Sequence, residues 1–113
     1  MKDERDKLVK VLDELMNFCF SLDMNDLDIK FNIDKTKATI NIEGPCKDAP
    51  LDKLQSLEDA FNDTRQPEFE EYYWPLMGGE HGYPEIELLG TFIDWGKISY
   101  EDNYLKMCII RKI

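Results

Sequence analysis

The chain has 113 residues, 42% of them hydrophobic, and a formal net charge of −10 at pH 7. This length suits one domain with its own core and is too short for two. Nucleic acid is bound largely through lysine and arginine, and anionic membranes also repel an acidic protein. We therefore expect a single domain, 1–113, that binds neither nucleic acid nor membranes directly, whereas a protein with a basic surface is a partner that this charge allows.

The chain carries no sign of export in its sequence. Residues 1–7 are charged in both signs, unlike a signal peptide, and no run of about 18 apolar residues follows. Cys19, Cys46 and Cys108 are odd in number, widely spaced and without a Cys-x-x-Cys pair, so we expect three reduced thiols. These features favour a cytoplasmic protein, and we expect a bacterial one.

The first element is predicted to be a helix over 4–22. Its apolar residues recur at alternating steps of four and three, which is the spacing of one helix face: Leu8, Leu12, Leu15, Cys19 and Leu22. Val11 and Phe18 widen this stripe. The pattern indicates a helix that packs one side against a sheet.

Two hairpins are predicted, one on each side of the central part of the chain. In the first, strict alternation pairs Ile33 with Ala38, Phe31 with Ile40 and Ile29 with Ile42, across the loop 34–37, and all of these apolar residues face one way. In the second, Asp102-Asn103 forms a two-residue turn, so that Ile98 and Tyr100 face Met107 and Leu105. Because Cys108 and Ile110 place apolar side chains on the opposite face, the last strand should be central in its sheet.

Three helical segments are predicted between the hairpins, over about 50–62, from Pro67 to about 76, and over 85–95. The last could also be a strand. The glycine-rich stretch Gly78–Pro84 is expected to be a loop. The predicted fold is therefore α+β, in the order α-β-β-α-α-α-β-β. The two hairpins form one antiparallel sheet of about four strands, with the N-terminal and central helices packed on one face.

The chemical character of the chain is concentrated between Asp48 and Trp95. This stretch holds 12 acidic and two basic residues, so its net charge of −10 equals that of the whole protein. It also holds eight of the 13 aromatic residues. Acidic side chains beside aromatic rings suit contact with a cationic partner. Because Tyr72-Tyr73-Trp74 cannot all face one core, we expect a partner-binding surface at the following residues: Glu70, Glu71, Tyr73, Trp74, Glu80, His81 and Tyr83.

Catalysis and cofactor binding are not expected. His81 is the only histidine, and no further nitrogen or sulfur ligands lie near it in sequence, so no metal site is predicted. The sequence has no phosphate-binding loop, dinucleotide fingerprint or nucleophile elbow. The many acidic pairs single out no particular pair for acid–base chemistry.

These observations favour a small acidic, non-enzymatic protein-interaction domain. One specific version is an inhibitor or immunity-type protein that masks a basic partner by charge mimicry. A second alternative is a small-ligand or metal-binding domain with a pocket at the Gly78–Pro84 loop. A third is a homodimer that joins sheets or apolar faces, with Cys108 and Ile110 as candidate contacts.

Overall fold

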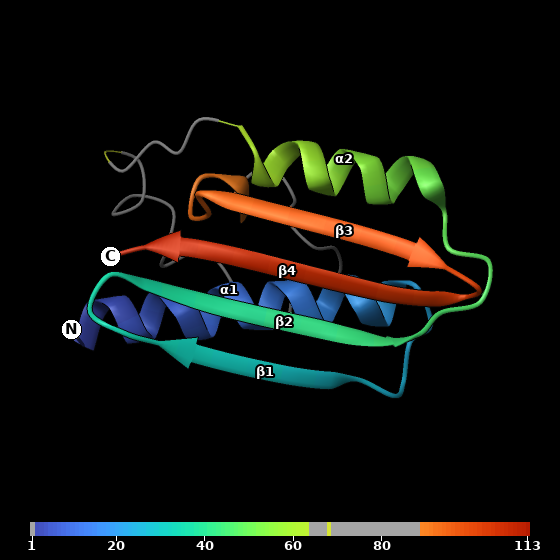
Figure 1. Cartoon of the computed structure of the whole chain (residues 1–113), viewed down its shortest axis with the longest axis horizontal. Helices are drawn as coiled ribbons and strands as arrows, with labels where there is room; N and C mark the ends of the chain where they lie inside the picture. Colours follow the sequence, from blue (N-terminus) through green and yellow to red (C-terminus); the bar gives the residue numbers. More distant parts are fainter. Residues whose placement is uncertain (1, 64–67, 69–88) are drawn as a thin grey trace.

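The computed structural model describes residues 2–63, 68 and 89–113 and has an α+β fold (Figure 1). One antiparallel sheet of four strands has the order β1-β2-β4-β3. Two helices pack on one of its faces, and the described elements follow one another as α-β-β-α-β-β. The predicted fold class is confirmed, and the last strand is central as expected.

Helix α1 (Lys2–Ser21) begins and ends close to its predicted bounds. The side chains of its apolar stripe are buried against the sheet: Leu8, Val11, Leu15, Phe18, Cys19 and Leu22. Asp23 then adopts a left-handed conformation (φ 60°), and Met24 N donates a hydrogen bond to Cys19 O at 3.1 Å. A left-handed residue of this kind reverses the chain direction and satisfies carbonyls of the last turn.

The first hairpin joins β1 (Asp28–Ile33) to β2 (Lys37–Pro45) in the predicted register. Its turn is tighter than predicted, because Asp34 N donates to Lys37 O at 2.9 Å. The Asp34 carboxylate accepts hydrogen bonds from Thr36 N, Thr36 Oγ1 and Lys37 N at 2.7, 2.8 and 2.9 Å. These bonds hold the pKa of Asp34 below its ordinary value and fix the turn.

The second hairpin joins β3 (Trp95–Glu101) to β4 (Tyr104–Lys112). Asp102 and Asn103 both have positive φ, 53° and 58°, the conformation that a two-residue type I′ turn requires. The predicted pairs Ile98–Met107 and Tyr100–Leu105 are both present. Strand β4 also pairs with β2 along nine residue positions, from Lys37–Lys112 to Pro45–Tyr104. The two locally formed hairpins thus become one sheet.

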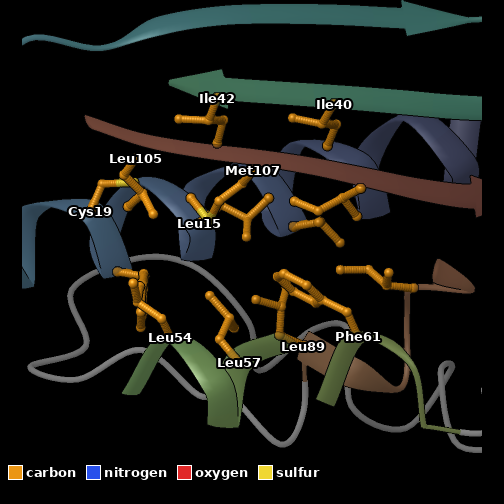
Figure 2. Packing of buried hydrophobic residues seen from close by; sticks show 14 of the residues in the cluster. Leu15, Cys19, Ile40, Ile42, Leu54, Leu57, Phe61, Leu89, Leu105 and Met107 are labelled. Carbon is orange, nitrogen blue, oxygen red and sulfur yellow. The ribbon is translucent and has the colours of Figure 1, made fainter. Parts of the chain in front are cut away.

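The core lies between the sheet and the helices. Helix α2 (Leu51–Phe61) covers the β3 side and buries Leu54, Leu57 and Phe61. Figure 2 shows these side chains opposite those of β2 and β4, with Leu15 and Cys19 of α1 in the same cluster. Gly96 lies on this inner face, where a Cβ atom would overlap the Phe61 ring. Glycine is required there by close packing rather than by an unusual backbone angle.

A buried arginine joins α1 to the sheet at the end of β4. Arg111, only 2% exposed, lies on the inner face, where its guanidinium donates to both Glu4 carboxylate oxygens at 2.9 Å. It also donates to Phe92 O at 3.0 Å. Bidentate pairs of this kind fix orientation as well as adding energy. Two other charged side chains of α1, Lys7 and Glu14, are also buried.

One predicted helix is wrong at its described end. The segment 85–95 was predicted as a helix, with a strand as the alternative, yet only Leu89 and Gly90 of its described residues are helical, and Trp95 opens β3. Trp95 and Gly96 pair with Ile110 and Ile109, so the ladder with β4 overrides helical periodicity there. The helix predicted from Pro67 to about 76 lies outside the described residues, apart from Glu68. The described chain therefore has two helices rather than the larger number predicted.

Candidate functional site

The partner-binding surface predicted from the sequence lies outside the described residues. This applies to Glu70, Glu71, Tyr73, Trp74, Glu80, His81 and Tyr83, and to the pocket expected at the Gly78–Pro84 loop. The described part of the acidic stretch includes α2, on which Asp52 and Asp59 are exposed, and Asp63 is exposed just beyond its end. The other candidate surfaces are the edges and faces of the sheet.

The outer face of the sheet has a charge opposite to that of the whole protein. The strand registers place on it five lysines, Lys30, Lys37, Lys97, Lys106 and Lys112, against three acidic residues, Asp28, Glu43 and Glu101. Trp95, 43% exposed, lies beside Ile110 near one end of this face. Cys108 and Ile110, the predicted dimer contacts, are both partly buried here. The acidity of the chain is therefore not uniform over its surface.

The edge strand β3 is covered by side chains of α2. Asn62 Nδ2 donates to Gly96 O at 2.8 Å, and Gly96 N donates to Asn62 Oδ1 at 3.2 Å. One step along the same edge, Ile98 N donates to Glu58 Oε2 at 2.7 Å. Outward-facing backbone groups of an edge strand are a template for pairing with another chain. At β3 these three groups are occupied by the protein itself.

Strand β1, at the opposite edge, has no comparable cover among the described residues. All its hydrogen bonds in this part of the chain belong to the β1–β2 ladder. Its apolar residues face the core side of the sheet, as predicted, but Ile29 is 38% and Phe31 40% exposed. By contrast, their partners on β2, Ile42 and Ile40, are almost fully buried. The apolar layer thus continues beyond the part of the sheet that α1 covers.

The flank of α1 beside β1 extends this apolar surface. Val9 and Phe20, 65% and 51% exposed, lie off the buried stripe on the same side as the half-buried Leu12 and Met16. Since α1 is right-handed and runs behind β2 in the direction opposite to β1 (Figure 1), the flank at Leu12 and Met16 lies on the β1 side of the helix, and Val9 and Phe20 lie farther round, toward its outer surface. We name the set Val9, Phe20, Ile29 and Phe31 the β1 edge surface.

The outward backbone groups of β1 belong to the same residues that expose apolar side chains. In an antiparallel pair, residues alternate between hydrogen-bonded and non-hydrogen-bonded positions. The bond from Asp34 N to Lys37 O marks a hydrogen-bonded position. Every second residue before it, Asn32, Lys30 and Asp28, therefore bonds to β2. The N–H and C=O groups of Ile29, Phe31 and Ile33 consequently point away from β2. An incoming strand would meet backbone groups and apolar side chains at the same positions.

The cysteines form no site in the described chain. Cys19, Cys46 and Cys108 are all free thiols, as expected, with Cys19 and Cys46 buried. Burial, with a smaller contribution from nearby Cys46, raises the pKa of Cys19 to about 12. Burial and, to a lesser extent, the charge of Asp23 raise the pKa of Cys46 as well. Protonated, buried thiols of this kind are poor nucleophiles and poor metal ligands.

The described ranges offer little to a metal ion or a small ligand. No group of three or more histidine, cysteine or acidic side chains there could hold a metal ion. A hollow of about 300 Å³ lies between α2 and β3 and is lined by Leu51, Leu54, Gln55, Glu58, Ile98 and Tyr100. It is open to solvent, and its two ionisable residues already have partners: Glu58 accepts a hydrogen bond from Ile98 N, and the Tyr100 hydroxyl donates to Cys46 O. Within the same ranges, neither helix is long and apolar enough to cross a membrane.

Sequence reasoning did not single out the residues of the β1 edge surface. Ile29 and Phe31 fit a buried alternating pattern, and alternation alone cannot show whether a helix covers the strand. One signal was available: Val9, Met16 and Phe20 fall off the apolar stripe of α1 at steps of seven and four. A second apolar row on a helix that already has a core face indicates another contact.

Comparison with known proteins adds no family. No known protein family matches this sequence, and no curated protein is significantly similar to it.

Proposed function

We propose that this chain is a small, non-enzymatic protein-interaction domain that binds through the β1 edge surface by adding a partner's extended segment to its sheet. The observation that carries the proposal is the asymmetry of the two sheet edges. At β3, Glu58 and Asn62 occupy the outward backbone groups. At β1, the corresponding groups of Ile29 and Phe31 have no such cover in the described chain, and their side chains are exposed.

Strand addition uses both features of this edge. Main-chain hydrogen bonds from Ile29 and Phe31 supply affinity, while their side chains and those of Val9 and Phe20 supply an apolar contact on one face only. Proteins commonly protect an edge with charge, proline, bulges or a covering element. Within β1, one lysine, Lys30, provides charge on the outer face, but its apolar face has no such protection.

Site-specific photo-crosslinking in cells that express the protein tests this proposal. A photoreactive residue at position 29 should form protein adducts, identified by mass spectrometry. The matched control is position 51, because Leu51 is exposed (67%) and apolar but lies on α2; it should form none. An absence of adducts at position 29, with either another protein or a second copy, would refute the proposal.

The charge-mimicry alternative uses a different surface. Its described part is the exposed acidic set Asp52 and Asp59 on α2 and Asp63 just after it, which would attract a basic partner in a salt-dependent way. Replacing these three residues with asparagine would weaken such a complex steeply at low salt, while Phe31→Thr would leave it unchanged. The opposite result would favour the β1 edge surface.

A further inference from the structure

We infer that the segment added to β1 is the β1 strand of a second copy of this chain, in an antiparallel register centred on Ile29. This inference rests on the proposed function, because it names the partner of the same edge. The dimer would have one continuous sheet of eight strands, with two β1 strands at its centre. The capped β3 strands would then form both outer edges, so the assembly would close without a further free edge at β1.

Hydrogen bonding restricts the registers to those that pair odd-numbered residues with odd-numbered residues. The outward N–H and C=O groups of β1 belong to Ile29, Phe31 and Ile33, as the bond between Asp34 N and Lys37 O determines. A two-fold pair centred on a residue satisfies this condition, whereas one centred between two residues does not. The same condition places both apolar layers on one side of the joined sheet. The allowed registers that keep at least three strand residues of each copy paired are centred on Ile29, Lys30, Phe31 or Asn32.

Charge and the hydrogen bonds of the Asp34 turn decide among these four registers. Centring on Lys30 places the two lysines directly opposite each other, and centring on Phe31 places Asp28 opposite Asp34 of the second copy. Like charges directly opposite are destabilising in a sheet. Centring on Asn32 places Lys30 opposite Asp34 of the second copy, but the Asp34 carboxylate is already held in its own turn by Thr36 and Lys37. Centring on Ile29 instead places Asp28 opposite Lys30 twice, once on each side of the two-fold axis.

The apolar contacts of this register fit the charge contacts. Ile29 faces Ile29 of the second copy, and Phe31 faces Leu27, which is partly buried in the single chain. Asp28 and Lys30 occupy non-hydrogen-bonded positions across the new interface, where paired side chains lie closest. Both side chains are exposed in the single chain and so are open to this pairing.

The two α1 helices would also approach each other across the new strand pair. Each lies behind β2, and the two β2 strands would be separated by three strand spacings, or about 14 Å. A helix with its side chains is about 10–12 Å across, so the space between the helices is one that side chains can fill. The flank of each α1 that carries Leu12 and Met16 would face this space, with Val9 and Phe20 at its outer rim. The exposed apolar side chains of β1 would thereby be covered.

The test is a charge-swap cycle on the whole chain, with dimerisation measured by sedimentation equilibrium from micromolar to several hundred micromolar concentration. Asp28→Lys and Lys30→Asp should each weaken the dimer by roughly tenfold, because two attractive pairs become repulsive. The double variant, with both charges exchanged, should restore dimerisation to within about threefold of the parent. Lys97→Asp is the matched control: it changes net charge as Lys30→Asp does, but on β3, and should leave the dimer unchanged.

The outcomes separate this inference from the proposed function. A parent chain that stays monomeric over the whole range overturns the second copy as the partner. Crosslinks from position 29 to a different protein would then still support the proposed function, whereas their absence would refute both. A dimer that tolerates both single swaps overturns pairing through β1 in this register. A dimer that Asp28→Lys strengthens also overturns it, and indicates the register centred on Phe31. Circular dichroism of each variant identifies any loss of folding.

Discussion

Removing the amide of Asn62 should destabilise the protein through a single glycine on β3. Asn62 follows α2 and is the only described side chain that binds both the N–H and the C=O of Gly96. Gly96 is buried against Phe61, so the two backbone groups are poorly placed to find water. In Asn62→Ala, both lose their partner while the backbone of the helix end is retained.

The structure allows the size of this effect to be estimated. Leaving a buried backbone group unpaired costs about 1–3 kcal/mol. Because Asn62 itself is exposed, water can reach one of the two groups after truncation, which brings the expected loss to about 2 kcal/mol rather than twice the single-group cost. That is a large share of the stability of a small domain. It corresponds to a fall of about 1 M in the urea midpoint.

Urea unfolding followed by circular dichroism measures this loss. Gln55→Ala is the control, because Gln55 is an exposed amide on the same helix and donates one hydrogen bond to Asp59 Oδ1 at 2.9 Å. It should change stability by no more than about 0.5 kcal/mol. If Asn62→Ala is no more destabilising than Gln55→Ala, Asn62 does not hold the β3 edge, and the asymmetry between the two edges loses its basis.

Three further predictions concern the core. Arg111→Met should lower the free energy of unfolding by about 3 kcal/mol, because it leaves Glu4 and Phe92 O without their donor. Arg111→Lys should recover only part of this loss, since lysine lacks the bidentate fork. Urea titration of both variants measures the two free energies. Gly96→Ala should destabilise by about 1–3 kcal/mol, because its methyl group would overlap the Phe61 ring; a stability equal to that of the parent would contradict the packing described. Burial raises the pKa of Cys19 to about 12. The contribution of its neutral thiol to the free energy of unfolding should therefore be complete below pH 9 and lost as pH rises from 9 through about 12. Cys19→Val should flatten this alkaline limb, and a limb unchanged in the variant would assign it to other groups.

Much of the local structure could be predicted from the sequence because it depends on neighbours in the chain. Alternation of apolar residues gave the registers Ile29–Ile42 and Ile98–Met107, and the pair Asp102-Asn103 specified a turn with two positive φ angles. The helix ending at Trp95 was wrong, because pairing of Trp95 with Ile110 is a contact between distant residues. The candidate surface of Glu70 to Tyr83 stays a prediction, since it lies outside the described residues.

Spacings of two, three and four residues were enough to predict helices α1 and α2, the two hairpins and the apolar face of each element. Contacts between distant segments set the rest: β2 pairs with β4, α2 reaches β3 with Glu58 and Asn62, and α1 stops short of covering β1. These are relations between segments tens of residues apart, and no local period encodes them. The difference between a closed and an open sheet edge, on which the proposed function depends, is of this second kind.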